Sequence, residues 1–190
     1  SFAKSQSKSA AASGDKPFDG ARKQWTERFE TIRKMAGSEN PYQIAKELGE
    51  VMTENVTVVR YNDKLKKTLE TIKGFKDRWA RCNVLDTSNN SNRSLSFVNQ
   101  LWNMLELGEV ITHAALLRDE SRGAHYKPDF KLPEPKTKDP NQDPEWMKLW
   151  KARHEKWAKT TIARWSPSGS QITYEDIPTP VLDPEPRWYA

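Results

Sequence analysis

The side chains that could bind a ligand are densest between Glu120 and His125, where Ser121, Arg122 and Gly123 complete the segment. A planar guanidinium beside an imidazole can bind a carboxylate, because arginine offers parallel N–H donors to both oxygens. A cation and a glycine are also typical of the end of a helix, where they satisfy the terminal carbonyls. The residue types alone therefore leave two interpretations open, an anion-binding turn and an ordinary helix end.

Patterns that would indicate catalysis are missing from the sequence. It has no glycine-rich phosphate loop, no cysteine and histidine spacing typical of a metal site, and no nucleophile in a recognisable sequence context. The histidines His113, His125 and His154 are scattered, and we interpret the first and last as structural or surface residues. We therefore assign no catalytic, no cofactor-binding and no metal-binding residue.

Charge does not indicate a nucleic-acid partner. The chain has 31 Lys and Arg against 26 Asp and Glu, so its net charge of +5 is mixed in sign. Five lysines of one predicted helix could bind phosphate, but Glu70 and Asp77 interrupt them, which favours a solvated helix face; they are Lys64, Lys66, Lys67, Lys73 and Lys76. The single cysteine, Cys82, cannot form an intrachain disulfide, which favours a buried thiol in a reducing compartment.

The length of 190 residues and the mean hydropathy of -0.91 indicate about one domain, with part of the chain outside its core. No apolar run reaches the roughly 20 residues that a membrane-spanning helix needs. Residues 1–14 lack the apolar core of a signal peptide. Because the sequence does not begin with Met, we expect it to be a piece of a longer protein.

Hydrophobic periodicity predicts the elements that must position the turn. Asn40 followed by Pro41 is a helix start, and the polar loop 83–92 is a helix stop. Residues 56–61 fit either a short extended link or more helix. Trp25, Trp79 and Trp102 lie on apolar helical stripes, so we predict that all of them are core residues. The predicted helices are residues 21–36, 41–55, 62 or 63 to about 82, and 95–118.

The composition changes after Phe130, where repeated prolines predict an extended connector. A helix then starts at Asp143-Pro144 and is expected to continue through Trp157 to Ile162. Alternation at Ile172 and Tyr174 predicts one isolated strand, and the proline-rich tail 178–186 should lie extended on a surface.

The predicted fold class is all-α. It consists of an antiparallel three-helix bundle with an additional N-terminal helix, a late C-terminal helix and an extended Pro-rich tail. The predicted domain layout is a linker (1–20), a helical bundle domain (21–130) and an extended C-terminal segment with one helix and a short strand (131–190).

The chain resembles the C-terminal region of the flavoprotein subunit of succinate dehydrogenase and fumarate reductase from about Ala21 to its end. The resemblance follows the family's order and spacing in the blocks 47–60, 103–130, 157–161 and 186–189. The second block includes Glu120-Ser121-Arg122-Gly123-Ala124-His125-Tyr126. Thr160-Thr161 stands where many members have His-Thr, and the sequence looks closest to bacterial, menaquinone-linked enzymes.

The resemblance implies a spectrin-repeat-like bundle packed on a Rossmann-type FAD domain, in an enzyme that moves hydride from succinate to covalently bound flavin. It also implies an iron-sulfur subunit and a membrane anchor subunit as partners, electron transfer to quinone, and a peripheral position on the cytoplasmic side of the bacterial inner membrane. In the family, the residues that hold FAD and the dicarboxylate lie upstream. We therefore expect the chain alone to bind no FAD and to be inactive.

Under this resemblance, Glu120, Ser121, Arg122, Gly123 and His125 are expected to dock against the FAD domain, with Arg122 bonding a carboxylate or carbonyls across the boundary. The alternative is a free-standing helical module that binds an acidic protein or nucleic acid through its lysine-rich helix.

Overall fold

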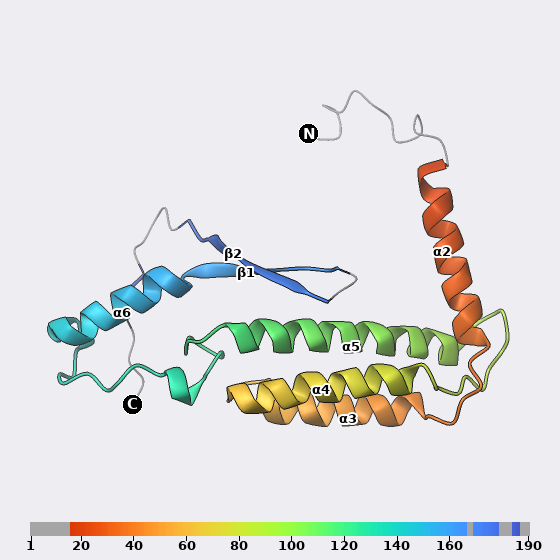
Figure 1. Cartoon of the computed structure of the whole chain (residues 1–190), viewed down its shortest axis with the longest axis horizontal. Helices are drawn as coiled ribbons and strands as arrows, with labels where there is room; N and C mark the ends of the chain where they lie inside the picture. The colour runs from red at the N-terminus through yellow and green to blue at the C-terminus, as the bar shows by residue number, and fades with distance from the viewer. Residues whose placement is uncertain (1–15, 167–168, 179–183, 187–190) are drawn as a thin grey trace. The chain divides into compact units, whose positions relative to one another are not determined.

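The structure is a computed structural model that describes residues 16–166, 169–178 and 184–186 (Figure 1). Within these residues the fold is mainly helical, as predicted, and the strands form one small sheet. The elements are α2 (Lys16–Arg33), α3 (Pro41–Asn55), α4 (Asn62–Trp79), α5 (Arg93–Leu117), α6 (Pro144–Trp157), β1 (Lys159–Arg164) and β2 (Gln171–Asp176). Short 3₁₀ turns lie at Pro128–Phe130 and Pro140–Gln142.

The predicted start of α3 is confirmed at atomic detail. The side-chain Oδ1 of Asn40 accepts from the backbone N–H of Tyr42 at 2.9 Å, and Pro41 occupies the first helical position. The first helix differs from its prediction, because α2 begins at Lys16 and ends at Arg33. Residues 16–20, predicted as linker, are therefore helical, and residues 1–15 lie outside the described residues.

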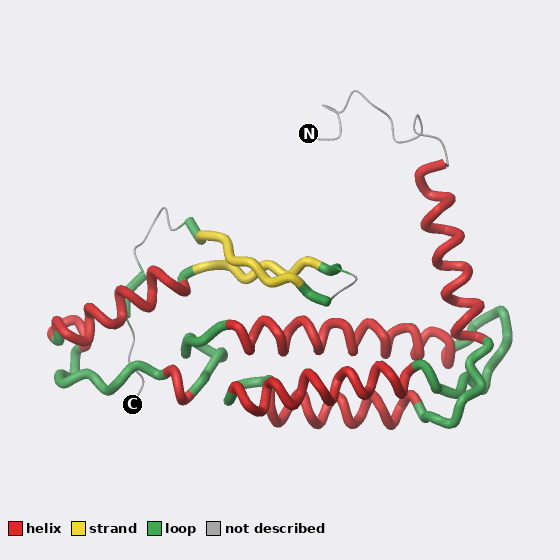
Figure 2. The backbone as a smooth tube through the Cα atoms, viewed as in Figure 1, coloured by secondary structure: helices red, strands yellow, loops and turns green. Residues whose placement is uncertain are grey.

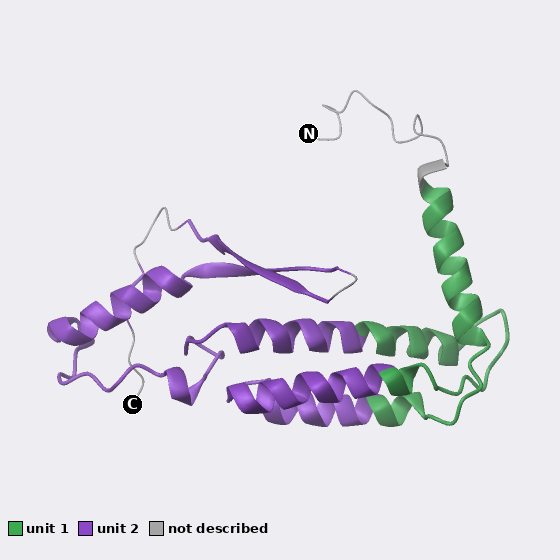
Figure 3. Ribbon diagram, viewed as in Figure 1, with its two compact units in different colours: residues 1–44, 77–103 green, residues 45–76, 104–190 purple. Residues whose placement is uncertain are grey.

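The chain divides into two compact units, residues 1–44 with 77–103 and residues 45–76 with 104–190 (Figure 3). In the first unit, Trp79 donates its indole N–H to the carbonyl of Val98 at 2.8 Å and packs on Trp102 with ring centroids 4.7 Å apart. The prediction that Trp25 is a core residue is wrong, because its side chain is 47% exposed. Its ring packs on Phe29 of the same helix, with centroids 5.7 Å apart, whereas Ile32 further along α2 is fully buried.

Gly37 lies where two loops of the first unit pair closely. Its N–H donates to the carbonyl of Cys82 at 3.1 Å, and a Cβ at this position would lie 2.0 Å from the carbonyl oxygen of Arg81. Gly37→Ala should therefore lower the free energy of unfolding by about 1–3 kcal/mol in a denaturant titration, as overpacking does. Gly49→Ala in α3 is the matched control, because a Cβ there meets nothing within 4 Å and should stabilise the helix slightly. Equal effects of the two substitutions would contradict the predicted clash.

The second unit contains the antiparallel bundle made by the adjoining parts of α3, α4 and α5 (Figure 1). Asn55 at the end of α3 donates to Thr68 near the start of α4, so these helices run in opposite directions. Asn62 at the start of α4 bonds Asp119 just past the end of α5, whereas Lys76 near the end of α4 bonds Glu106 and Glu109 further back along α5, so this pair is antiparallel too. The buried core of this unit contains Leu48, Val56, Leu65, Thr68, Ile72, Leu105, Thr112 and Ala115.

The C-terminal segment differs from its prediction in two ways, visible in Figure 2. Helix α6 ends at Trp157, and Ile162 lies in β1 instead of the helix. Two strands form, not one, because β1 pairs antiparallel with β2 so that Thr161 faces Tyr174. The run Thr160-Thr161-Ile162 explains both corrections, since β-branched side chains favour strands over helices.

Part of one prediction concerns residues that the structure does not describe. Of the proline-rich tail, residues 179–183 lie outside the described part of the chain. Among the residues that are described, no helix has both the length and the apolar character needed to cross a bilayer.

Candidate functional site

The segment after α5 folds into a tight turn. Arg122 and His125 exchange backbone hydrogen bonds, from the Arg122 N–H at 2.8 Å and from the His125 N–H at 3.0 Å. Gly123 has φ +56°, a left-handed conformation that glycine adopts without strain. Since α5 already ends at Leu117, this glycine shapes the following turn and is not the residue that ends the helix. The interpretation of Gly123 as part of a helix end is therefore wrong, because this glycine lies beyond the last turn of α5.

Glu120 is the buried centre of the turn. Its side chain is fully buried, and its two oxygens accept from Arg118 Nε at 2.6 Å and from Arg122 Nε at 2.9 Å. Charge-assisted bonds of this kind are what a buried carboxylate needs to remain charged inside a protein. Part of the Arg122 guanidinium is therefore used within the chain.

Arg118 connects the end of α5 to the junction between α6 and β1. Its Nη1 donates to the carbonyl of Lys159 and to Thr161 Oγ1, each at 3.0 Å, and its Nη2 donates to the carbonyl of Trp157. The guanidinium carbon also lies 5.6 Å from the centroid of the Trp157 ring. Sequence reasoning missed this role, because every partner except Glu120 is far away in the sequence.

Two hydrogen-bond partners determine which ring nitrogen of His125 carries the hydrogen. Its Nε2 lies 2.8 Å from the carbonyl oxygen of Arg118, and because a carbonyl only accepts, Nε2 carries the hydrogen. The other nitrogen, Nδ1, then accepts from Nη1 of Arg60. Burial lowers the pKa of His125, and the positive charges of Arg60 and Lys127 lower this pKa further, against opposing effects of the Arg118 carbonyl and Glu120. The folded protein therefore favours the neutral imidazole.

This arrangement predicts a dependence of stability on pH. The unfolded chain protonates its histidine near pH 6.5, whereas the folded chain does so only at lower pH, so the unfolded state binds more protons in between. The contribution of His125 is therefore complete above about pH 6.5 and is lost as the pH falls towards the lowered folded pKa. Between these values, denaturant titrations should show a shallower pH slope for His125→Gln than for the native chain. Parallel slopes, or a ring pKa above 6.5 by NMR, would contradict the assignment.

Ser121 and Lys127 close the other side of the turn. Ser121 Oγ accepts from the N–H of Lys127 at 2.9 Å and donates to the carbonyl of the same residue at 2.6 Å. The buried ammonium of Lys127 donates to the carbonyl of Leu116 and to Asp119 Oδ1, each at 3.0 Å. Burial lowers the pKa of Lys127. Asp119 also accepts from Asn62, so the turn is joined to the start of α4.

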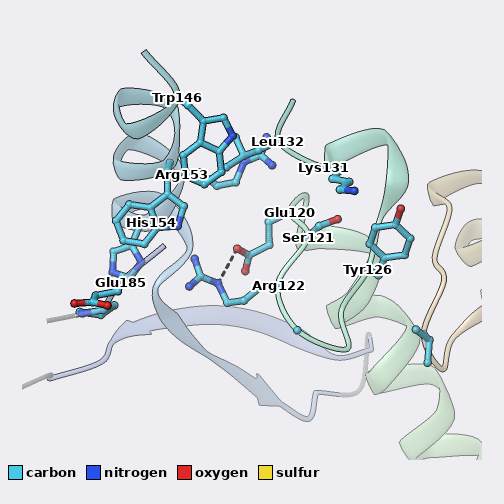
Figure 4. A pocket seen from close by; sticks show the side chains of 14 residues that line it. Glu120, Ser121, Arg122, Tyr126, Lys131, Leu132, Trp146, Arg153, His154 and Glu185 are labelled. Carbon is cyan, nitrogen blue, oxygen red and sulfur yellow. Dashed lines mark hydrogen bonds and ion pairs between the residues drawn. The ribbon is translucent and has the colours of Figure 1, made fainter. Parts of the chain in front are cut away.

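A cavity of about 620 Å³ lies beside this turn in the second unit (Figure 4). The 120–126 turn, the following connector, α6, two tail residues and Val58 line it. Among the described lining residues, Arg122, Lys131 and Arg153 are positively charged, and Trp146 and Trp150 are aromatic. Of the sequence-predicted residues, Glu120, Ser121, Arg122 and Gly123 line the cavity, whereas His125 does not. The contribution of α6 was not predicted, because only the fold brings that helix next to the turn.

The described residues do not fit FAD. Their strands form an antiparallel hairpin rather than the parallel strand-helix-strand unit on which a dinucleotide is bound, and the sequence has no glycine-rich phosphate loop. Within the described part of the chain, no group of at least three His, Cys, Asp or Glu side chains could hold a metal ion. We therefore derive no chemical step through either kind of group.

The remaining candidates behave as ordinary structural residues. Lys76 of the lysine-rich helix is engaged by two glutamates of α5, which removes it from a phosphate-binding face. His113 lies within α5, where its Nδ1 is 2.8 Å from Ser170 Oγ. Cys82 is buried as predicted, and burial raises the pKa of its thiol to about 11.

Comparison with known proteins agrees with the resemblance seen in the sequence. The family profile described as "Fumarate reductase flavoprotein C-term" matches residues 45–189. The succinate dehydrogenase flavoprotein subunit of Bacillus subtilis is 41% identical over 174 residues, which cover 91% of this chain and 27% of that protein. A fumarate reductase flavoprotein subunit from a Serratia species is 28% identical over 165 residues, covering 86% of this chain and 25% of that protein.

Solved structures show the same fold. The FrdA chain of E. coli quinol fumarate reductase aligns with a TM-score of 0.71 at 24% identity, over 97% of this chain and 28% of that chain. A quinol-fumarate reductase solved with menaquinol aligns with a TM-score of 0.65 at 24% identity, over 84% of this chain and 25% of that chain. The chain thus spans about a quarter of the length of these relatives. Because the profile covers most of its residues, the chain belongs to the fumarate reductase flavoprotein C-terminal family, as a C-terminal domain of the flavoprotein subunit of succinate dehydrogenases and fumarate reductases.

Proposed function

We propose that this chain is the C-terminal helical domain of a flavoprotein subunit that oxidises succinate to fumarate. The observation that supports this most directly is the 41% identity to a succinate dehydrogenase subunit along nearly the whole chain, against 28% for the Serratia fumarate reductase subunit. FAD would be bound by the part of the subunit outside this chain. Electrons would pass through an iron-sulfur subunit and a membrane anchor subunit to a quinone, at the cytoplasmic face of the inner membrane.

In this proposal the chain braces the subunit and contributes no reacting group. Its domain layout would be the helical bundle 21–130, which α2 extends back to Lys16, followed by the C-terminal segment 131–190. The turn with Glu120, Ser121, Arg122, Gly123 and His125 would dock against the FAD domain. The buried Glu120 and the bonds of Arg118 support this proposal, because they hold the turn against the rest of the chain.

The test is an activity measurement on the full-length subunit that contains this chain, assembled with its partner subunits. Succinate-dependent quinone reduction should exceed quinol-dependent fumarate reduction, and covalently bound flavin should be found outside residues 1–190. The chain purified alone should retain no flavin and show no activity. A faster fumarate reduction would reverse the proposed direction, and an absence of both activities would refute the function.

Arg122→Lys tests the docking role of the turn. Lysine keeps the charge but loses the planar fork, so a contact to another domain should weaken by about 1.5–3 kcal/mol. In the full-length subunit we expect a lower melting temperature and less assembled, flavinylated enzyme, with a much smaller effect on the chain alone. Arg81→Lys is the control, because Arg81 is 58% exposed and its nearest carboxylate oxygen, on Glu39, is 3.7 Å away. Equal losses in the chain and in the subunit would mean that Arg122 serves only Glu120.

A further inference from the structure

Among the described residues that line the cavity beside the turn, cationic side chains outnumber carboxylates. Arg122, Lys131 and Arg153 line it together with Glu120 and Glu185. Glu120 already accepts from two arginines, one of which, Arg118, lies outside the cavity lining. Figure 4 shows the Arg122 side chain between Glu120 and the side chains of α6. The cavity is therefore complementary to an anion.

Several hydrogen-bond donors at the cavity have no partner within the described part of the chain. Arg122 uses Nε for Glu120, and neither of its Nη atoms has a partner among the described residues. Arg153 donates from Nη1 to the carbonyl of Phe130. The Nδ1 atom of His154 is buried and has no hydrogen-bond partner among those residues, although its ring stacks on Trp150. A buried polar atom without a partner costs free energy, so a ligand that supplies oxygen atoms would be favoured here.

Exposed valines at the rim of the cavity favour a polypeptide segment over a small free acid as the ligand. Val58 lines the cavity and is 51% exposed, and the neighbouring Val59 is 43% exposed. Arg122 is likewise 43% exposed on its side chain. A small carboxylic acid would pair with the arginines but leave the valines in water, whereas a polypeptide segment would cover both.

We propose that the cavity receives an Asp or Glu side chain from the part of the flavoprotein subunit outside this chain. This inference rests on the proposed function and names the chemistry of the docking partner. The carboxylate bonds the Nη atoms of Arg122 and reaches Arg153 or His154, while the flanking residues of its segment cover Val58. Arg122 thus joins two carboxylates, one within this chain and one from the docked segment.

Photo-cross-linking in the full-length subunit tests the proposal. A benzophenone maleimide attached to Lys131→Cys places the reactive group at the cavity, and the buried Cys82 is not labelled. Accessible cysteines elsewhere in the subunit are replaced first. Mass spectrometry should find cross-links to an Asp- or Glu-containing peptide outside residues 1–190, and adding Arg122→Gln should lower their yield about tenfold. The same probe at Lys66→Cys, on the exposed face of α4, should give cross-links whose yield does not change with Arg122→Gln.

Each other outcome overturns the proposal in a distinguishable way. Cross-links confined to this chain, or a yield that Arg122→Gln leaves unchanged, would refute docking at the cavity even if the subunit is flavinylated and active. Saturable succinate binding to this chain, followed by tryptophan fluorescence and lost in Arg122→Gln, would assign the cavity to a small free acid instead. A subunit without flavin or activity would refute the proposed function, whatever the cross-links show.

Discussion

Replacing Arg118 with methionine is expected to lower the free energy of unfolding by about 3–5 kcal/mol. Methionine keeps much of the packing volume of the arginine side chain but has none of its side-chain N–H donors. One oxygen of the buried Glu120 and the main-chain carbonyls of Trp157 and Lys159 lose their charged donor, while Arg122 still bonds the other Glu120 oxygen. Denaturant titration of the chain measures the loss.

The control for this prediction is Arg22→Met in α2. Arg22 lies 3.7 Å from Asp19, and these side chains are 69% and 59% exposed, so its loss should cost about 0.5 kcal/mol or less. Adding Glu120→Gln to Arg118→Met should recover part of the stability, because the buried charge is removed together with its partner. An effect of Arg118→Met no larger than that of Arg22→Met would refute the role of Arg118 in joining α5 to the C-terminal segment.

Replacing Lys127 with methionine is expected to cost about 2–3 kcal/mol, the scale of losing charge-assisted hydrogen bonds from a buried group. The Lys127 side chain is only 1% exposed, and its ammonium bonds the carbonyl of Leu116 in the last turn of α5. It also bonds Asp119, but that carboxylate is 40% exposed and keeps Asn62, so water compensates part of its loss. The same denaturant titration measures the cost.

Lys46→Met provides the comparison for Lys127. Lys46 lies 3.9 Å from Glu50 one helical turn away, and its side chain is 69% exposed, so we expect almost no change in stability. If Lys127→Met is as stable as Lys46→Met, the buried ammonium contributes no net stability and its methylene chain is the part that matters.

The sequence-based predictions are accurate where the deciding interaction joins residues close in the sequence, and they fail where it joins distant residues. Asn40 and Pro41 locate the start of α3 because a helix cap is made by neighbouring residues. The end of α6 was placed too late, because Ile162 continues a helical spacing of apolar residues. Its β-branched neighbours Thr160 and Thr161 instead pair with residues of β2. Exposure of Trp25 could not be predicted, because helical spacing identifies a face but not what covers it.

The same reasoning explains what was missed at the candidate site. The sequence identified the turn through its local combination of charged residues and glycine. It could not identify Arg60 or Arg153, whose contacts with His125 and Phe130 depend on how distant segments fold together. Lys127 was also missed, because lysine is rarely fully buried and local pattern gives no sign that it is.

The bonds of Arg118 have a consequence for how relatives of this chain can diverge. At Trp157 and Lys159 the acceptor is a main-chain carbonyl, which every amino acid provides. Substitutions at position 159 therefore leave that hydrogen bond available, whereas a change of Arg118 alone leaves the buried Glu120 with one donor fewer, a cost that a matching change of Glu120 reduces. Among homologues, residue 159 should drift freely while positions 118 and 120 covary.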